Sequence, residues 1–219
     1  MDISKISWEK LTDKTWETLI MTGESLLFVF AIGLLLGLVL YLTSNSNNYF
    51  VKAVYSVTAA IVNIFRAIPF IILIVLLLPF TKFLMGTIIG TQAALPALII
   101  SAAPFYARLV EIGLREVDKG VIEAAKAMGA KNTTIILKVL IPESKPALVS
   151  GLTVTAIALV GATAMAGVIG AGGLGNLAYL EGFQRSNNTL TLAATIVILI
   201  IVFAIQFLGD YVVKKIDKR

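Results

Sequence analysis

Cysteine and histidine are both absent from this chain of 219 residues. Their absence excludes disulfides, thiol nucleophiles, haem ligation by histidine and the usual zinc sites. The carboxylates are scattered singly, so no pair or cluster suggests acid–base catalysis. The sequence also lacks the G-x-x-x-x-G-K-[ST] phosphate loop, so any ATP hydrolysis has to occur on another chain. We therefore expect neither an enzyme nor a cofactor or metal ion on this chain.

Apolar residues are what the chain has in excess. They make up 58% of the sequence, and the mean hydropathy is +0.93, whereas a soluble domain is roughly half apolar. A net charge of +5 is compatible with nucleic-acid binding, but most of the positive charge flanks apolar stretches, as the positive-inside rule describes. The composition indicates an integral membrane protein that contacts the lipid bilayer and no nucleic acid.

Five apolar stretches reach or approach the roughly 20 residues that a membrane-spanning helix needs. We therefore predict an all-α integral membrane protein with about five transmembrane helices. The predicted spans cover about residues 19–42, 62–81, 88–110, 147–168 and 190–208. The fourth is rich in small residues, which allow close helix contact, so we expect it near the centre of the bundle. The fifth is aliphatic, and we expect it at the periphery.

Polar segments lie outside these spans at both ends of the chain. Residues 1–17 mix lysines with carboxylates and carry Trp8 and Trp16, which fits an extracytoplasmic or interfacial N-terminal segment. Residues 212–219 form a basic tail. If the loop between the third and fourth spans is cytosolic, 13 of the 18 lysines and arginines lie inside, against five in the opposite orientation. The N-terminus is therefore expected outside and the C-terminus in the cytosol.

The longest polar segment between two apolar blocks is the loop of residues 115–145, and we call its part from Asp118 to Pro142 the knuckle. Asp118 is a suitable N-cap, and apolar residues follow it at helical spacing. This pattern predicts a helix of about ten residues that ends at Gly129. Asn132 is placed to cap a second short helix, which Pro142 closes because proline cannot donate to the preceding turn.

The knuckle contains E-A-A, three further residues, a glycine, nine more residues and then V-L-I-P. This pattern resembles the EAA loop of type I ABC importer permeases, a coupling helix that sits in a groove on a separate ATP-hydrolysing subunit. Val139 and Ile141 stand where that family usually has Ile and Leu, and both replacements are conservative. The resemblance implies that coupling to the ATPase subunit involves Glu123, Ala124, Ala125, Gly129 and Pro142.

Three further stretches are similar to the methionine-import permeases within that family. They are R-A-I-P-F-I-I-L at 66–73, S-A-A-P-F-Y-A-R at 101–108 and G-A-G-G-L-G at 170–175. The resemblance extends over nearly the whole chain. It implies that residues 18–211 form a single ABC transmembrane domain of type 1.

The same resemblance implies a permease subunit that moves a small amino acid, methionine, across the cell membrane by alternating access. The implied partners are two copies of an ABC ATPase subunit and an extracytoplasmic substrate-binding lipoprotein. A second copy of this chain is also expected, because five spans make a thin wall and two copies about a two-fold axis can enclose a pathway.

Two positions inside the spans are candidates for a role in that pathway. Met165 lies beside Thr163 and Ala164 in A-T-A-M-A-G, and a similar pattern occurs in the methionine-import permeases. Its flexible thioether can seal a gap at the dimer axis; the alternative is an ordinary packed methionine. Arg66 is predicted to lie one turn inside the second span and to reach the cytosolic interface as an anchor. The alternative for Arg66 is a role in transport or in subunit contact.

Two other features have simpler interpretations. Glu24 is the only carboxylate well inside a predicted span, which makes it a functional candidate, but its place about one turn from the external end favours interfacial exposure. The glycines of residues 170–175 match the dinucleotide pattern G-x-G-x-x-G, which needs a strand before it and a helix after it in a soluble unit. We interpret this segment as a flexible external turn.

An ion-coupled secondary transporter or channel for a small solute is the alternative function. Such a protein needs ionisable side chains or broken-helix ion sites near the bilayer midplane. The fourth span carries no charge, and the fifth reaches Asp210 only at its end. The sequence therefore offers little that can couple transport to protons or sodium.

Overall fold

The structure is a computed structural model that describes residues 7–44 and 46–217. Within these ranges five helices are long and apolar enough to cross a membrane, which confirms the predicted fold class. The long helices are α1 (Trp8–Thr43), α2 (Tyr49–Ala67), α5 (Thr91–Arg115), α8 (Ile141–Ala166) and α10 (Asn188–Ile216). The short helices are α3 (Phe70–Leu76), α4 (Leu78–Met85), α6 (Lys119–Ala127), α7 (Asn132–Ile135) and α9 (Gly173–Asn176). The π-helical stretches are η2 (Ile136–Leu140), η3 (Gly167–Ala171) and η4 (Leu177–Phe183).

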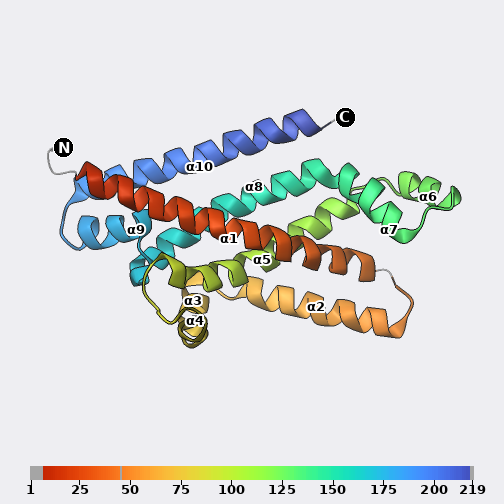
Figure 1. The fold of residues 1–219 in the computed structure, drawn as a ribbon, viewed down its shortest axis with the longest axis horizontal. Helices are drawn as coiled ribbons and strands as arrows, with labels where there is room; N and C mark the ends of the chain where they lie inside the picture. The colour runs from red at the N-terminus through yellow and green to blue at the C-terminus, as the bar shows by residue number, and fades with distance from the viewer. Residues whose placement is uncertain (1–6, 45, 218–219) are drawn as a thin grey trace.

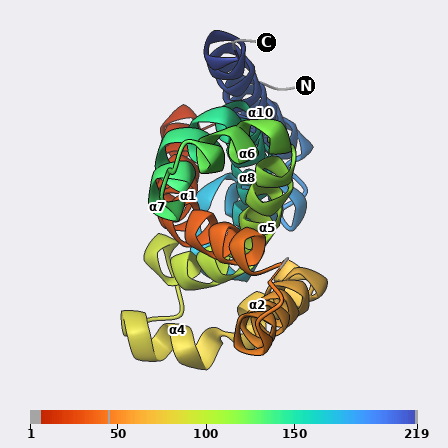
Figure 2. The same cartoon turned by 90° about the vertical axis from the view of Figure 1, so that its right-hand side faces the viewer.

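The long helices run side by side, with α1, α5 and α8 in the middle (Figure 1). Helices α6 and α7 project at one end of the molecule, which we call the knuckle end, while α9 and the start of α1 lie at the other. Figure 2 shows α2 and α4 on one side of the bundle and α10 on the opposite side. The peripheral place of α10 agrees with the prediction, and its exposed Phe203 and Phe207 are suited to contact lipid.

Close contact between α1 and α5 depends on two glycines. Gly33 and Gly37 of α1 face Tyr106 and Val110 of α5, and a Cβ atom added to them would lie 2.7 and 2.5 Å from those side chains. Small residues thus bring two membrane helices together. α5 is the most enclosed of the spans. α8 packs against α5, α10 and α1, as the predicted central place requires, and its side at Gly161 is open.

Helix α1 is longer than a membrane span. Its 36 residues extend about 54 Å, against about 30 Å for the hydrocarbon core. The helix passes the boundary predicted at residue 17 without a break, because no glycine or proline lies between Trp8 and that point. Trp8 and Trp16 are both exposed, as expected at an interface. The rest of the predicted N-terminal segment, residues 1–6, lies outside the described residues.

The basic tail predicted for residues 212–219 is likewise not a separate segment. Lys214 and Lys215 belong to the last turn of α10, which continues to Ile216. Residues 218–219 lie outside the described residues.

The predicted second span, residues 62–81, is not a single helix. α2 ends at Ala67 and α3 begins at Phe70. Ile68 is extended, with φ −78° and ψ 123°, because the residue before a proline is disfavoured in the helical region, and Pro69 has no N–H to continue the ladder. The second long apolar helix is α2, which the sequence analysis missed because polar residues are scattered through its first half.

The glycine-rich segment at residues 170–175 is a packed turn, which corrects the expectation of a flexible one. Its three glycines with positive φ are Gly170, Gly172 and Gly173. The Glu17 carboxylate accepts a hydrogen bond from the backbone N–H of Gly173 at 2.6 Å, and the Thr18 hydroxyl accepts one from Leu174 at 2.9 Å. The start of α1 therefore holds the connection between α8 and α10.

Candidate coupling surface and transmembrane pocket

The first helix of the knuckle forms as the sequence predicts. The Asp118 carboxylate accepts a hydrogen bond from the Gly120 N–H at 2.6 Å and caps α6. At the other end Gly129 has φ 77°. The Gly129 and Ala130 N–H groups donate to the carbonyls of Lys126 and Ala125, at 2.9 and 3.1 Å. These two hydrogen bonds form the Schellman motif, which requires the left-handed conformation that glycine adopts without strain.

The second part of the knuckle differs from the prediction. Asn132 is the first residue of α7 and makes no side-chain cap. Pro142 does not close the helix, because helical backbone continues from η2 through this residue into α8. Before the proline, the Ile141 N–H donates to the carbonyl of Ile136, five residues back. This π-type register lets the helix pass a residue that has no donor.

The residues of the predicted coupling contact do not all face outward. Glu123 and Ala124 are exposed, whereas Ala125 is buried inside the knuckle, where α6 lies against η2. Glu123 makes no hydrogen bond or ion pair with any other described residue, so it does not brace its own loop. Its carboxylate and the small Ala124 are therefore available to another protein.

The knuckle also presents apolar side chains that the sequence analysis did not select. Met128 is 82% exposed, and Leu137 and Val121 are exposed as well. They belong to α6, to its C-terminal end and to η2, and α6 projects at the knuckle end of the molecule (Figure 1). An exposed apolar patch of this kind is typical of a contact with another protein. The position of Met128 directly before the helix-ending glycine was the available sequence signal.

A buried carboxylate lies where α5 enters the knuckle. Glu111 is 1% exposed. Its two carboxylate oxygens accept hydrogen bonds from Arg108 at 2.6 Å and from Arg115 at 2.7 Å. The charges are three and four residues apart on one helix, a spacing that brings side chains together. This spacing was visible in the sequence. Glu111 was not proposed as a site residue because it lies with the two arginines at the charged border between the predicted third span and the loop.

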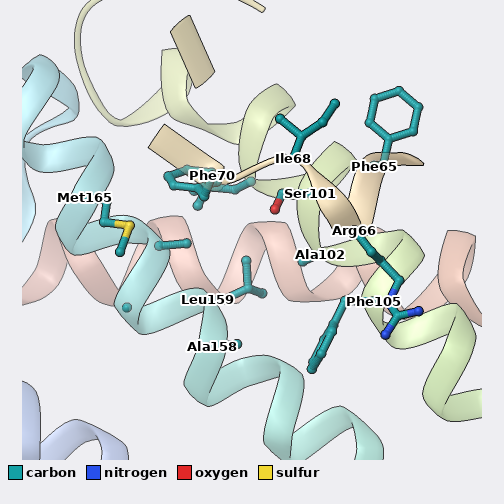
Figure 3. Close-up of a pocket in the computed structure, with 13 residues that line it drawn as sticks. Phe65, Arg66, Ile68, Phe70, Ser101, Ala102, Phe105, Ala158, Leu159 and Met165 are labelled. Atoms are coloured by element: carbon teal, nitrogen blue, oxygen red, sulfur yellow. The ribbon is translucent and has the colours of Figure 1, made fainter. Parts of the chain in front are cut away.

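A pocket of about 420 Å³ opens between the end of α2, the start of α3, the middle of α5 and the C-terminal part of α8. It contains the two pathway candidates Arg66 and Met165, which come from distant parts of the sequence. Figure 3 shows Met165 toward one end of the pocket and Arg66 with Phe105 toward the other. The remaining lining residues are Phe65, Ile68, Phe70, Leu98, Ser101, Ala102, Ala158, Leu159, Gly161 and Ala162.

The neighbours of Met165 do not line this pocket. Thr163 is buried, and its hydroxyl donates to the carbonyl of Val160 at 2.7 Å. Ala164 has its backbone against Gly175 of the packed turn. Met165 itself is 51% exposed. Only Met165 of this trio is therefore placed to contact a solute or a second copy of the chain.

Arg66 does not lie where the sequence placed it. It occupies the last turn of α2, 17 residues after Tyr49, or about 25 Å along the helix. α2 begins near the knuckle end and runs toward the middle of the molecule (Figure 1). The sequence placed Arg66 near the start of its span, whereas in the structure it lies in the last turn of the helix.

Glu24 lies near the middle of α1. It is half-buried and accepts a hydrogen bond from Gln92 at 3.2 Å, in the first turn of α5. The structure gives it no place in the transmembrane pocket.

Comparison with known proteins gives consistent matches over the chain. The family described as "Binding-protein-dependent transport system inner membrane component" matches residues 20–219. The methionine import system permease protein MetP of Bacillus subtilis is 68% identical over 210 residues, which are 96% of this chain and 95% of MetP. The probable D-methionine transport system permease protein MetI of Pasteurella multocida is 45% identical over 97% of this chain and 98% of its own length.

A solved structure shows the same fold. A chain of the MetNI methionine ABC transporter, in an inward-facing conformation, superposes with a TM-score of 0.92 at 46% identity. The match covers 96% of this chain and 98% of that one.

Proposed function

Because this chain belongs to the methionine import permease family of ABC transporters, we propose that methionine is the amino acid that it carries across the membrane. Family membership makes the chain a multi-pass permease component of an ABC importer, and it sets aside the ion-coupled alternative. The observation that carries the choice of substrate is the 68% identity to a methionine permease over almost the full length.

The partners follow from the exposed surfaces. Glu123, Ala124 and Met128 form an outward surface of the knuckle, which fits a groove on an ATPase subunit. A second copy of the chain faces the open side of α8 at Gly161, so that the pathway lies between the two copies. Two ATPase subunits that close on nucleotide draw the two knuckles together. The extracytoplasmic end of the pathway then opens toward a substrate-binding lipoprotein.

Transport by the assembled importer is the direct test. Proteoliposomes that contain this permease, its ATPase and its binding protein are expected to accumulate radiolabelled methionine when ATP is present. Excess unlabelled L- or D-methionine should compete, and excess histidine should not. Uptake that histidine abolishes and methionine leaves unchanged would refute the proposed substrate.

The proposed orientation places the knuckle in the cytosol and α9 outside, because the positively charged loop and the C-terminal lysines lie toward one end of the molecule. Cysteine labelling tests this, because the parent chain has no cysteine. Lys131→Cys should react with a membrane-impermeant thiol reagent only after the cells are opened. Arg185→Cys, an exposed position at the other end, should react in intact cells. The reverse pattern would invert the topology.

Met165 is proposed to meet its counterpart at the dimer axis and to seal the pathway between transport cycles. Its half-exposed thioether can fill an irregular gap. Met165→Ala should let preloaded methionine leak from proteoliposomes without ATP, while ATP hydrolysis remains stimulated by substrate. Met165→Leu nearly conserves the side-chain volume, so proteoliposomes with this variant should retain their methionine. Equal efflux from the parent and the alanine variant would identify an ordinary surface methionine.

A further inference from the structure

The transmembrane pocket combines one charge with apolar walls. Arg66 is its only charged lining residue, and Ser101 contributes a hydroxyl. Aromatic and aliphatic side chains, including Phe70 and Leu159, make up most of the remaining surface. A site with a few convergent polar groups in an apolar cavity is the usual form of a small-molecule site.

The pocket lies deep between the two ends of the molecule. Ser101 and Phe105 come from the middle of α5, which runs from Thr91 to Arg115. The end of α2 contributes Arg66 to the same pocket, so this side chain lies at the level of the middle of α5 (Figure 3). Ionisable residues at such depth face a bundle interior or a water-filled cavity, and they mark substrate pathways.

Arg66 has no partner within the part of the chain that the structure describes. No hydrogen bond or ion pair joins it to another described residue, in contrast to Arg108 and Arg115, which share Glu111. A guanidinium group has five donors in a planar fork that matches a carboxylate. In an apolar pocket an unpaired fork is suited to bind an anion that arrives with a ligand.

The break in α2 supplies the opposite polarity next to this cation. The last carbonyls of a helix have no intrahelical partner and carry partial negative charge. Here Pro69 has no N–H to donate to the carbonyl of Phe65, which also belongs to the pocket lining. Broken membrane helices use such carbonyls to bind cations at mid-membrane sites. A positive side chain and free carbonyls are thus adjacent.

We propose that this pocket binds the amino acid in transit through its zwitterionic end. Arg66 binds the carboxylate, the carbonyls at the end of α2 accept the ammonium group, and the apolar walls toward Met165 hold an unbranched side chain. The inference rests on the proposed function and adds to it a site on the permease itself that binds the carboxylate of the amino acid. Selection by this site is separate from selection by the binding protein.

Direct binding to the permease–ATPase complex in nanodiscs, without the binding protein, tests the site. The probe is tritiated L-methionine, with norleucine and methioninol as competitors. Norleucine keeps the carboxylate and an unbranched apolar chain, whereas methioninol lacks the carboxylate. Norleucine should displace the probe and methioninol should not. Arg66→Gln should weaken binding by about tenfold to a hundredfold, since it removes a charged, bidentate partner.

Two further variants separate a binding role from a structural one. Arg66→Lys keeps the charge but loses the fork, so an intermediate affinity is expected. Arg185→Gln makes the same chemical change at an exposed residue outside the pocket and should bind like the parent. Competition by methioninol as strong as that by norleucine, equal binding by Arg66→Gln, or no binding to the parent complex would each overturn the site. Methionine uptake by the parent importer tests the proposed function separately, because uptake can occur whether or not this pocket binds the amino acid.

Discussion

Gly129→Val is expected to abolish most of the coupling between ATP hydrolysis and transport while leaving insertion into the membrane unchanged. Gly129 has φ 77° with no atom near the position of a Cβ, so the obstacle is backbone strain and not a clash. A β-branched residue in that conformation costs about 1–3 kcal/mol. The Schellman turn should then open and displace Glu123 and Met128. In reconstituted importer, substrate-stimulated ATP hydrolysis and uptake should fall together by about tenfold or more.

The matched control at this position is Gly129→Asn, because asparagine tolerates the left-handed conformation. It should retain most of the coupling. Glu123→Ala leaves the turn intact and removes only the exposed carboxylate, so it tests the proposed contact with the ATPase. Parent rates for both Gly129→Val and Glu123→Ala would show that the knuckle does not couple the two subunits.

Glu111→Gln is expected to produce the largest loss of stability among single polar substitutions at the base of the knuckle. The amide N–H₂ would face a guanidinium group, and the charge between Arg108 and Arg115 would be lost. Breaking a buried ion pair costs about 3–5 kcal/mol, and we expect about 2–4 kcal/mol here because both arginines reach solvent. Thermal unfolding of the detergent-solubilised complex should shift to lower temperature.

The control for this prediction is Glu116→Gln, five residues along the chain, where the side chain is exposed. Its unfolding temperature should match that of the parent, since surface charges contribute little. If both variants lowered the unfolding temperature equally, the ion pairs of Glu111 with Arg108 and Arg115 would not stabilise the protein more than a surface charge does.

The number of spans and the first helix of the knuckle could be predicted because each depends on local patterns. Apolar length predicts a membrane helix, and a capping aspartate followed by a glycine at the right distance predicts the ends of α6. The resemblance identified the coupling segment for the same reason, since its residues are close in sequence. None of these features depends on the folding of distant segments against each other.

Other features could not be predicted because they depend on tertiary contacts. Nothing local shows that Arg66 and Met165, about one hundred residues apart, line the same pocket. The burial of Ala125 depends on the return of the chain through η2. The turn at residues 170–175 is held by Glu17, which lies near the other end of the chain. The glycines alone indicated a flexible segment because this contact is not visible in the local sequence. Pro142 was expected to end a helix because π-type register is not visible in the residue types.

The helix α8 has a mechanical consequence. Its 26 residues form a rod about 39 Å long, which begins where the knuckle ends, passes the pocket and ends beside the packed glycine turn. Tilting such a rod by roughly 10° about its midpoint moves each end by about 3 Å in opposite directions. A displacement imposed on the knuckle thus becomes an opposite displacement at the far side of the membrane. The helix works as a lever, and its fulcrum is the contact with α5.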